Sequence, residues 1–179
     1  GEVYVVYGSE SRLPTKLDFD EIDGTNGFRI YGTQDGYDNV GFWLSLLGDF
    51  NGDGFDDMAV VASYGQFVGQ SYVLFGRSSA FSSSVSASSI PGNNGFRIVG
   101  IDDGDLLKTV SGIGDVNGDG YADVIVGAYQ NDDAGNNAGE AYVYHGSSSG
   151  LSATPDWREH GASSSHRDRY SLPCHVEVN

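Results

Sequence analysis

The chain has 179 residues, of which 39% are hydrophobic, and this is enough apolar material to form a core. Its formal net charge of −16 argues against a nucleic-acid partner, because phosphate contacts require lysine and arginine. No apolar run approaches the roughly 20 residues needed to cross a bilayer, so we expect no membrane span. Glycine is abundant (27 residues) and proline is rare (4), which favours short strands joined by tight turns.

Internal repeats are evident along the chain. The segment Ile22–Ile30 returns as Ile90–Ile98, with Asn-Gly-Phe-Arg-Ile in both copies. A strand-like segment that ends in glycine occurs three times, at Glu2–Gly8, Ser71–Gly76 and Ala141–Gly146. The repeating unit is therefore about 68 residues long.

Within one unit the pattern predicts four short strands. Val40–Leu47 is apolar and is followed by an acidic loop, and Met58–Ala62 is a continuous apolar run typical of a buried strand. Tyr72–Phe75 and Gly95–Gly100 are the third and fourth strands. The serine-rich segment Ser78–Ser89 is expected to be a connection, and its serine run Ser82–Ser89 is expected to be flexible. Four short strands per unit are typical of a propeller blade.

Two acidic loops have the same spacing and begin 66 residues apart, Asp49–Asp57 and Asp115–Asp123. Each has oxygen-bearing side chains at positions 1, 3, 5 and 9 and glycine at position 6, where we expect a positive φ. Such donors in a tight loop suit Ca²⁺, and the carbonyl of position 7 would be a fifth ligand. The candidate metal ligands of the two sites are Asp49, Asn51, Asp53, Phe55, Asp57, Asp115, Asn117, Asp119, Tyr121 and Asp123.

A helical calcium hand is the obvious alternative for these loops. That motif has a bidentate glutamate at position 12 and continues as a helix. Here position 12 is Val60 or Val126, and the residues that follow favour strand. We therefore reject the helical hand, and the aspartate at position 9 must replace the missing glutamate.

The segments Gly48–Asp57 and Gly114–Ala128 resemble FG-GAP repeats, which are found in integrin alpha-subunit β-propellers and in many bacterial surface and secreted proteins. The resemblance covers about residues 1–155 and implies that each loop joins the first and second strands of a blade and binds Ca²⁺ through the residues named above. The repeat opens with Val40-Gly41 or Leu106-Leu107 instead of Phe-Gly. This departure favours a non-integrin, bacterial-type member.

The expected fold is all-β, a partial β-propeller of two to three four-stranded antiparallel blades. Residues 1–32 would be the last two strands of a preceding blade, 33–100 one blade with a calcium loop, 101–157 a second such blade, and 158–179 a divergent or non-native tail. So few blades cannot close a ring. We therefore expect ring completion by a longer parent chain or by oligomerisation.

Other polar residues have less specific patterns. His145 occupies the position of Tyr7 and Phe75 in the sister repeats, so we expect a packed ring. The acidic segments Asp102–Asp105 and Asn131–Asp133 are expected to be solvated turns. The tail contains Cys174 and three of the four histidines, His160, His166 and His175, whose spacing matches no zinc pattern.

The sequence predicts a calcium-binding, integrin-like propeller module that is a structural scaffold or takes part in extracellular recognition and adhesion. No nucleophile–base pair or phosphate-binding loop indicates an enzyme. An extracellular or cell-surface location is expected because weak calcium sites fill where Ca²⁺ is plentiful. The ligand would be a protein or a carbohydrate. The alternatives are an accessory propeller segment of a larger secreted enzyme and a self-assembling repeat unit.

Overall fold

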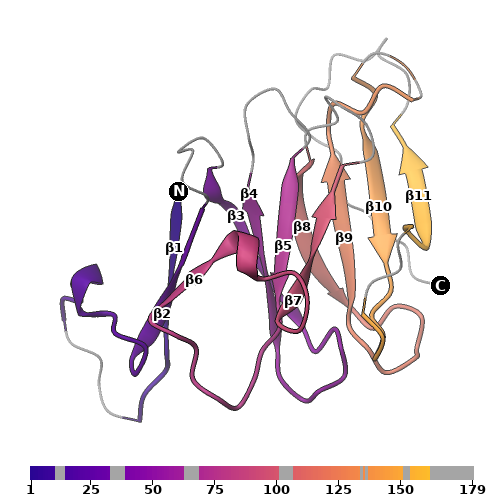
Figure 1. The fold of residues 1–179 in the computed structure, drawn as a ribbon. Helices are drawn as coiled ribbons and strands as arrows, with labels where there is room; N and C mark the ends of the chain where they lie inside the picture. The colour runs from indigo at the N-terminus through magenta and orange to yellow at the C-terminus, as the bar shows by residue number, and fades with distance from the viewer. Residues whose placement is uncertain are drawn as a thin grey trace.

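A computed structural model describes residues 1–10, 15–32, 39–62, 69–100, 107–133, 135, 137–150 and 154–161. The described chain forms three β-sheets stacked face to face (Figure 1). The first sheet has the order β1 (Glu2–Val6), β2 (Gly27–Tyr31), β6 (Ser84–Ser86). The middle sheet has the order β3 (Val40–Gly48), β4 (Asp57–Ala62), β5 (Gln70–Leu74), β7 (Gly95–Val99). The last sheet has the order β8 (Leu107–Gly114), β9 (Asp123–Ala128), β10 (Glu140–Tyr144), β11 (Trp157–His160).

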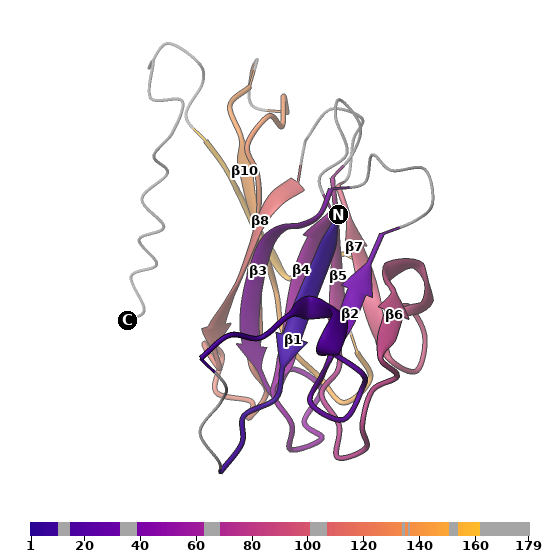
Figure 2. The ribbon, with the colours of Figure 1, turned by 90° about the vertical axis from the view of Figure 1, so that its left-hand side faces the viewer.

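The two four-stranded sheets are antiparallel throughout, and in each the first two strands are joined by an acidic loop. The prediction of an all-β fold made of partial β-propeller blades is confirmed. In Figure 2, β1 and β2 lie in front of β4 and β5, so the sheets form successive layers. None of the helices in the described ranges is long and apolar enough to cross a membrane.

The central strand β4 of the middle sheet is buried on both faces, which explains its continuous apolar run. Side chains alternate between the two faces of a strand. Val60 and Ala62 therefore pack into a core shared with the first sheet, whereas Ala59 and Val61 pack into a core shared with the last sheet. The largest fully buried side chains in these two cores include Ile30, Phe50 and Tyr142.

The expectation of a flexible serine-rich connection between β5 and β7 is wrong. Residues 84–86 form β6, which pairs in parallel with β2 of the first sheet. A 3₁₀ helix, η2 (Ala87–Ser89), follows, and Ala87 and Ile90 are buried in the core between the first two sheets. These two apolar residues anchor the segment, so the connection fastens one sheet to the next. A second 3₁₀ helix, η1 (Phe19–Glu21), precedes β2.

The outer strand of the last sheet, β11, extends across the expected boundary at residue 157. It pairs with β10 through Trp157 to His160, and the backbone N–H of Gly161 donates to the carbonyl of Gly139. The remainder of the predicted tail, 162–179, lies outside the described residues.

Candidate metal centre

The two acidic loops lie side by side at the lower end of the sheets in Figure 1. The backbone N–H of Ala122 donates to the carbonyl of Asp49 over 3.0 Å, which links the second loop to the first. A Cβ at Gly52 would collide with the ring of Tyr121, so glycine at this position permits the close approach. The structure therefore places both predicted sites at one rim and in contact.

In the first loop, side-chain oxygens of positions 1, 3 and 5 accept hydrogen bonds from backbone N–H groups. Asp49 accepts from Asp53 and Gly54, each over 2.9 Å, and Asn51 accepts from Asp53 over 2.9 Å. Asp53 accepts from Phe55 over 2.9 Å. These Asx-type turns wind the backbone around the three polar side chains. Gly54 has a φ of 90°, which confirms the predicted left-handed turn.

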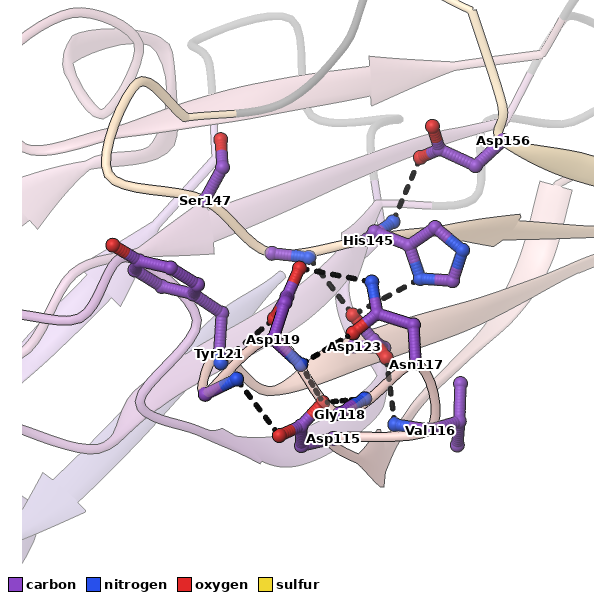
Figure 3. Close-up of polar contacts among 12 residues, drawn as sticks. Asp115, Val116, Asn117, Gly118, Asp119, Tyr121, Asp123, His145, Ser147 and Asp156 are labelled. Atoms are coloured by element: carbon purple, nitrogen blue, oxygen red, sulfur yellow. Dashed lines mark hydrogen bonds and ion pairs between the residues drawn. The ribbon is translucent and has the colours of Figure 1, made fainter.

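The second loop repeats this network with the equivalent residues, as Figure 3 shows. Asp115 accepts from the backbone N–H groups of Gly118, Asp119 and Gly120 over 2.7, 3.1 and 2.8 Å. The side-chain amide of Asn117 donates to Asp119 over 2.8 Å. Gly120 has a φ of 93°, again as predicted. Two loops of different sequence thus adopt one arrangement.

The aspartate at position 9 has a structural role that the spacing did not reveal. Asp57 is fully buried; one carboxylate oxygen accepts from the backbone of Phe50 over 3.0 Å and the other from Gly76 over 2.8 Å. Asp123 repeats this with Val116 (2.8 Å) and Gly146 (3.0 Å). Each aspartate therefore ties its loop to the end of the third strand of the sheet. Each oxygen keeps acceptor capacity for a second partner.

The electrostatics of the first loop favour a bound cation. The pKa of Asp57 is raised to about 6: burial is the largest cause, the negative charges of Asp53 and Asp49 add to it, and the two backbone hydrogen bonds of the carboxylate act against it. In the second loop, the backbone N–H of Tyr121 and the amide of Asn117 lower the pKa of Asp119. The donors are carboxylate and amide oxygens, so the residues present fit a hard divalent cation such as Ca²⁺.

His145 is not the simple packed ring that the repeat alignment predicted. Its Nδ1 lies 3.2 Å from a carboxylate oxygen of Asp123, and its backbone N–H donates to Asp156 over 2.8 Å (Figure 3). The equivalent residue of the middle sheet is Phe75, which packs against the core. The signal was present in the sequence, because His145 directly precedes the glycine that binds the position-9 aspartate.

Of the other acidic segments, Asp132 and Asp133 are exposed as expected, and only Asn131 differs. Asp102–Asp105 lies outside the described residues. Asn131 was expected in a solvated turn but is 1% exposed, and its side-chain amide donates to the hydroxyl of Tyr142 over 3.4 Å. Glu140, which sequence reasoning did not single out, is 1% exposed at the start of β10.

Comparisons with known proteins agree with the repeat pattern. The FG-GAP repeat family matches residues 41–74 and 109–144, and each match contains one acidic loop with its flanking strands. Integrin alpha-IIb of Mus musculus is 38% identical over 98 residues, which is 52% of this chain and 8% of that protein. Integrin alpha-4 of Xenopus laevis is 30% identical over 138 residues, 75% of this chain and 12% of that protein. The chain thus spans about a tenth of the length of these relatives.

Proposed function

The chain belongs to the FG-GAP repeat family, and we propose that it is a calcium-stabilised β-propeller segment that is a scaffold or recognition module outside the cell. The observation that carries this proposal is the pair of adjacent loops with one hydrogen-bond network and an all-oxygen donor set. The similarity to integrin alpha subunits supports the extracellular location, and the ligand that we propose there is a protein or a carbohydrate.

Ten residues would hold two calcium ions, five in each loop. They are the side chains at positions 1, 3, 5 and 9 and the carbonyl at position 7: Asp49, Asn51, Asp53, Phe55 and Asp57, then Asp115, Asn117, Asp119, Tyr121 and Asp123. Calcium, when bound, supplies the positive charge that offsets three carboxylates in each loop.

The protein's own contribution is to connect these ligands to three strands. Position 1 follows directly after the first strand, and position 9 begins the second strand. Through Gly76 or Gly146, the position-9 carboxylate also holds the end of the third strand. Ordering the loop therefore stabilises the blade, and the carboxylates are engaged as ligands and acceptors instead of as general acids.

Thermal unfolding in Ca²⁺ and in chelator tests this proposal. A ligand present at a hundredfold excess over its Kd adds about 2.7 kcal/mol per site. For a chain of this size that raises the Tm by about 5–10 °C per filled site. A Tm that is the same in Ca²⁺ and in chelator would refute the structural-calcium proposal.

Two matched variants localise the effect to the ligands. Asp53→Asn removes one ligand charge and should lose most of the calcium-dependent gain of the first site. Asp56→Ala removes an exposed charge at position 8, where the second loop has Ala122, and should keep that gain. Equal losses in both variants would indicate a general charge effect and not a site.

A second proposal concerns ring completion, and exposed apolar side chains on β3 favour it. Phe42, Trp43, Leu44 and Leu46 are 53, 47, 48 and 75% exposed on the first strand of the middle sheet. Such a cluster marks an interaction surface. We propose that further blades, from a longer parent chain or from other copies, cover it. Light scattering in Ca²⁺ separates the two, because a monodisperse monomer would exclude obligatory assembly of copies.

A further inference from the structure

Three metal-ligating side chains form a cluster in the last sheet. Two of them are on the start of β10 and the end of β11, which lie at the opposite end of this sheet from the acidic loops (Figure 1). Glu140 begins β10, His160 ends β11, and Asp133 belongs to the connection between β9 and β10. Glu140 and His160 are direct partners in the antiparallel register. One ligand atom from each residue lies within 4.8 Å of the other two. The sheet register therefore brings together residues that are far apart in sequence.

Two buried atoms of this cluster have no hydrogen-bond partner among the described residues, Oε1 of Glu140 and Nδ1 of His160. The Glu140 side chain is fully buried, and the two atoms lie 3.5 Å apart. A charge-assisted N–H···O bond would be about 2.7–2.9 Å long. Two ligand bonds of about 2.0–2.1 Å at a tetrahedral metal would separate such atoms by about 3.3 Å. The observed distance between Oε1 and Nδ1 is closer to the separation of two ligands of one ion than to the length of such a hydrogen bond.

The surrounding residues hold the glutamate in a fixed orientation. The hydroxyl of Tyr142 donates to Oε2 of Glu140 over 2.6 Å, which leaves Oε1 directed at His160. Asn131 donates to that hydroxyl, and its side-chain oxygen accepts from the backbone N–H of Asp133 over 3.0 Å. One buried amide thus orients two of the three candidate ligands, as outer residues of metal sites do.

The other two sheets provide an internal comparison. In the middle sheet, Tyr72 donates to Gln70 over 3.1 Å, and the register partner of Gln70 is Val99. In the first sheet, Tyr4 donates to Glu2 over 2.7 Å, and the partner of Glu2 is Tyr31. A tyrosine holding the first residue of the strand is therefore common to all three sheets. Among these three described register pairs, only Glu140 with His160 in the last sheet places an imidazole opposite a carboxylate.

We propose that Asp133, Glu140 and His160 bind a divalent transition metal of the zinc class. One imidazole nitrogen with two carboxylate oxygens suits zinc better than calcium, which prefers oxygen alone. Three protein ligands leave a fourth position for water or for an acidic group of a ligand. Arg158 lies 3.8 Å from Oε1 of Glu140 and balances part of its charge when the metal is absent. This site is independent of the proposed calcium function.

Zinc titration of the full chain by calorimetry tests the proposal. Millimolar Ca²⁺ is kept present so that the acidic loops are filled. The chain also carries Cys174→Ser, His166→Gln and His175→Gln, so that these three side chains cannot supply ligands. We expect one zinc ion per chain, and Co²⁺ should give a visible absorption band that zinc abolishes. The absence of both signals would overturn the proposal.

Single variants identify the ligands. His160→Val, which introduces the residue found at this register in the middle sheet, should weaken zinc binding at least tenfold. Asp133→Asn should also weaken it, and because Asp133 is exposed this variant is not expected to disturb folding. Glu159→Gln, next to His160 but on the opposite face of β11, is the matched control and should bind zinc as the parent does. Zinc binding that persists undiminished in His160→Val and Asp133→Asn would overturn the assignment.

Discussion

Asp57 gives the calcium-free protein a pH dependence of stability that can be calculated from the structure. Its carboxyl group is fully buried, and burial with the charges of Asp53 and Asp49 raises its pKa from 3.8 to about 6. A shift of this size corresponds to at most about 3 kcal/mol, at 1.36 kcal/mol per unit. The perturbation is Asp57→Asn, which cannot titrate in this range.

The sign follows from proton binding in the two states. Between pH 4 and pH 6 the native carboxyl holds a proton that the unfolded chain has lost. The free energy of unfolding therefore falls as pH rises through this range, and the loss is complete above pH 6. The asparagine variant lacks this loss. The substitution itself destabilises the fold, because an amide N–H₂ then faces a backbone N–H, but this destabilisation does not change with pH.

The assay is urea unfolding of wild type and Asp57→Asn in chelator at several values from pH 4 to pH 7. The free energy of unfolding of the variant, measured relative to that of wild type, should rise by up to about 3 kcal/mol from the lowest to the highest pH. In saturating Ca²⁺ the trend should reverse, because the ionised carboxylate is then needed as a ligand. A difference that stays flat in chelator would refute the argument from burial.

Three further outcomes are expected. Gly54→Ala should cost about 1–2 kcal/mol and weaken calcium binding, because the φ of 90° is unfavourable for alanine although the space around the Cβ is open; chemical unfolding and calcium titration measure both effects. Ser71→Ala should be neutral or stabilise by about 1 kcal/mol in urea unfolding, because the buried Ser71 hydroxyl has no hydrogen-bond partner among the described residues and the sister residue is Ala141. Tyr142→Phe should destabilise by about 1–3 kcal/mol, measured the same way, because it leaves an oxygen of buried Glu140 unpaired.

Much of the fold could be predicted because local pattern and tertiary environment agree. The run Met58–Ala62 is apolar at every position since both faces of β4 are covered, and the prediction of a buried strand there is confirmed. The strand β6 could not be predicted, because it is only three residues long and Val85 is its one apolar residue. Its conformation depends on backbone pairing with β2, which is a tertiary contact.

The candidate sites also have a part that the local sequence predicts and a part that depends on tertiary contacts. The inward-turned side chains of the loop positions follow from local spacing, since the described hydrogen-bond partners of the Asp49 carboxylate lie within five residues. The structural role of Asp57 depends on Gly76, 19 residues away and just beyond the end of β5. Glu140 and His160 become neighbours only through the register of β10 with β11. Spacing rules in the sequence therefore identify sites whose ligands come from one loop. They miss sites whose ligands are brought together by the pairing of strands in a sheet.

The three sheets have equivalent strands, so a residue that differs at an equivalent position shows what is particular to one sheet. A tyrosine donates to the first residue of its strand in all three sheets, at Tyr4, Tyr72 and Tyr142. In the last sheet, substitutions beside this common frame change the chemistry, with His145 in the place of Phe75 and His160 opposite Glu140. Both imidazoles lie within 3.5 Å of a buried carboxylate. The repeat therefore accounts for the fold, and these two histidines give the last sheet imidazole–carboxylate contacts at both of its ends.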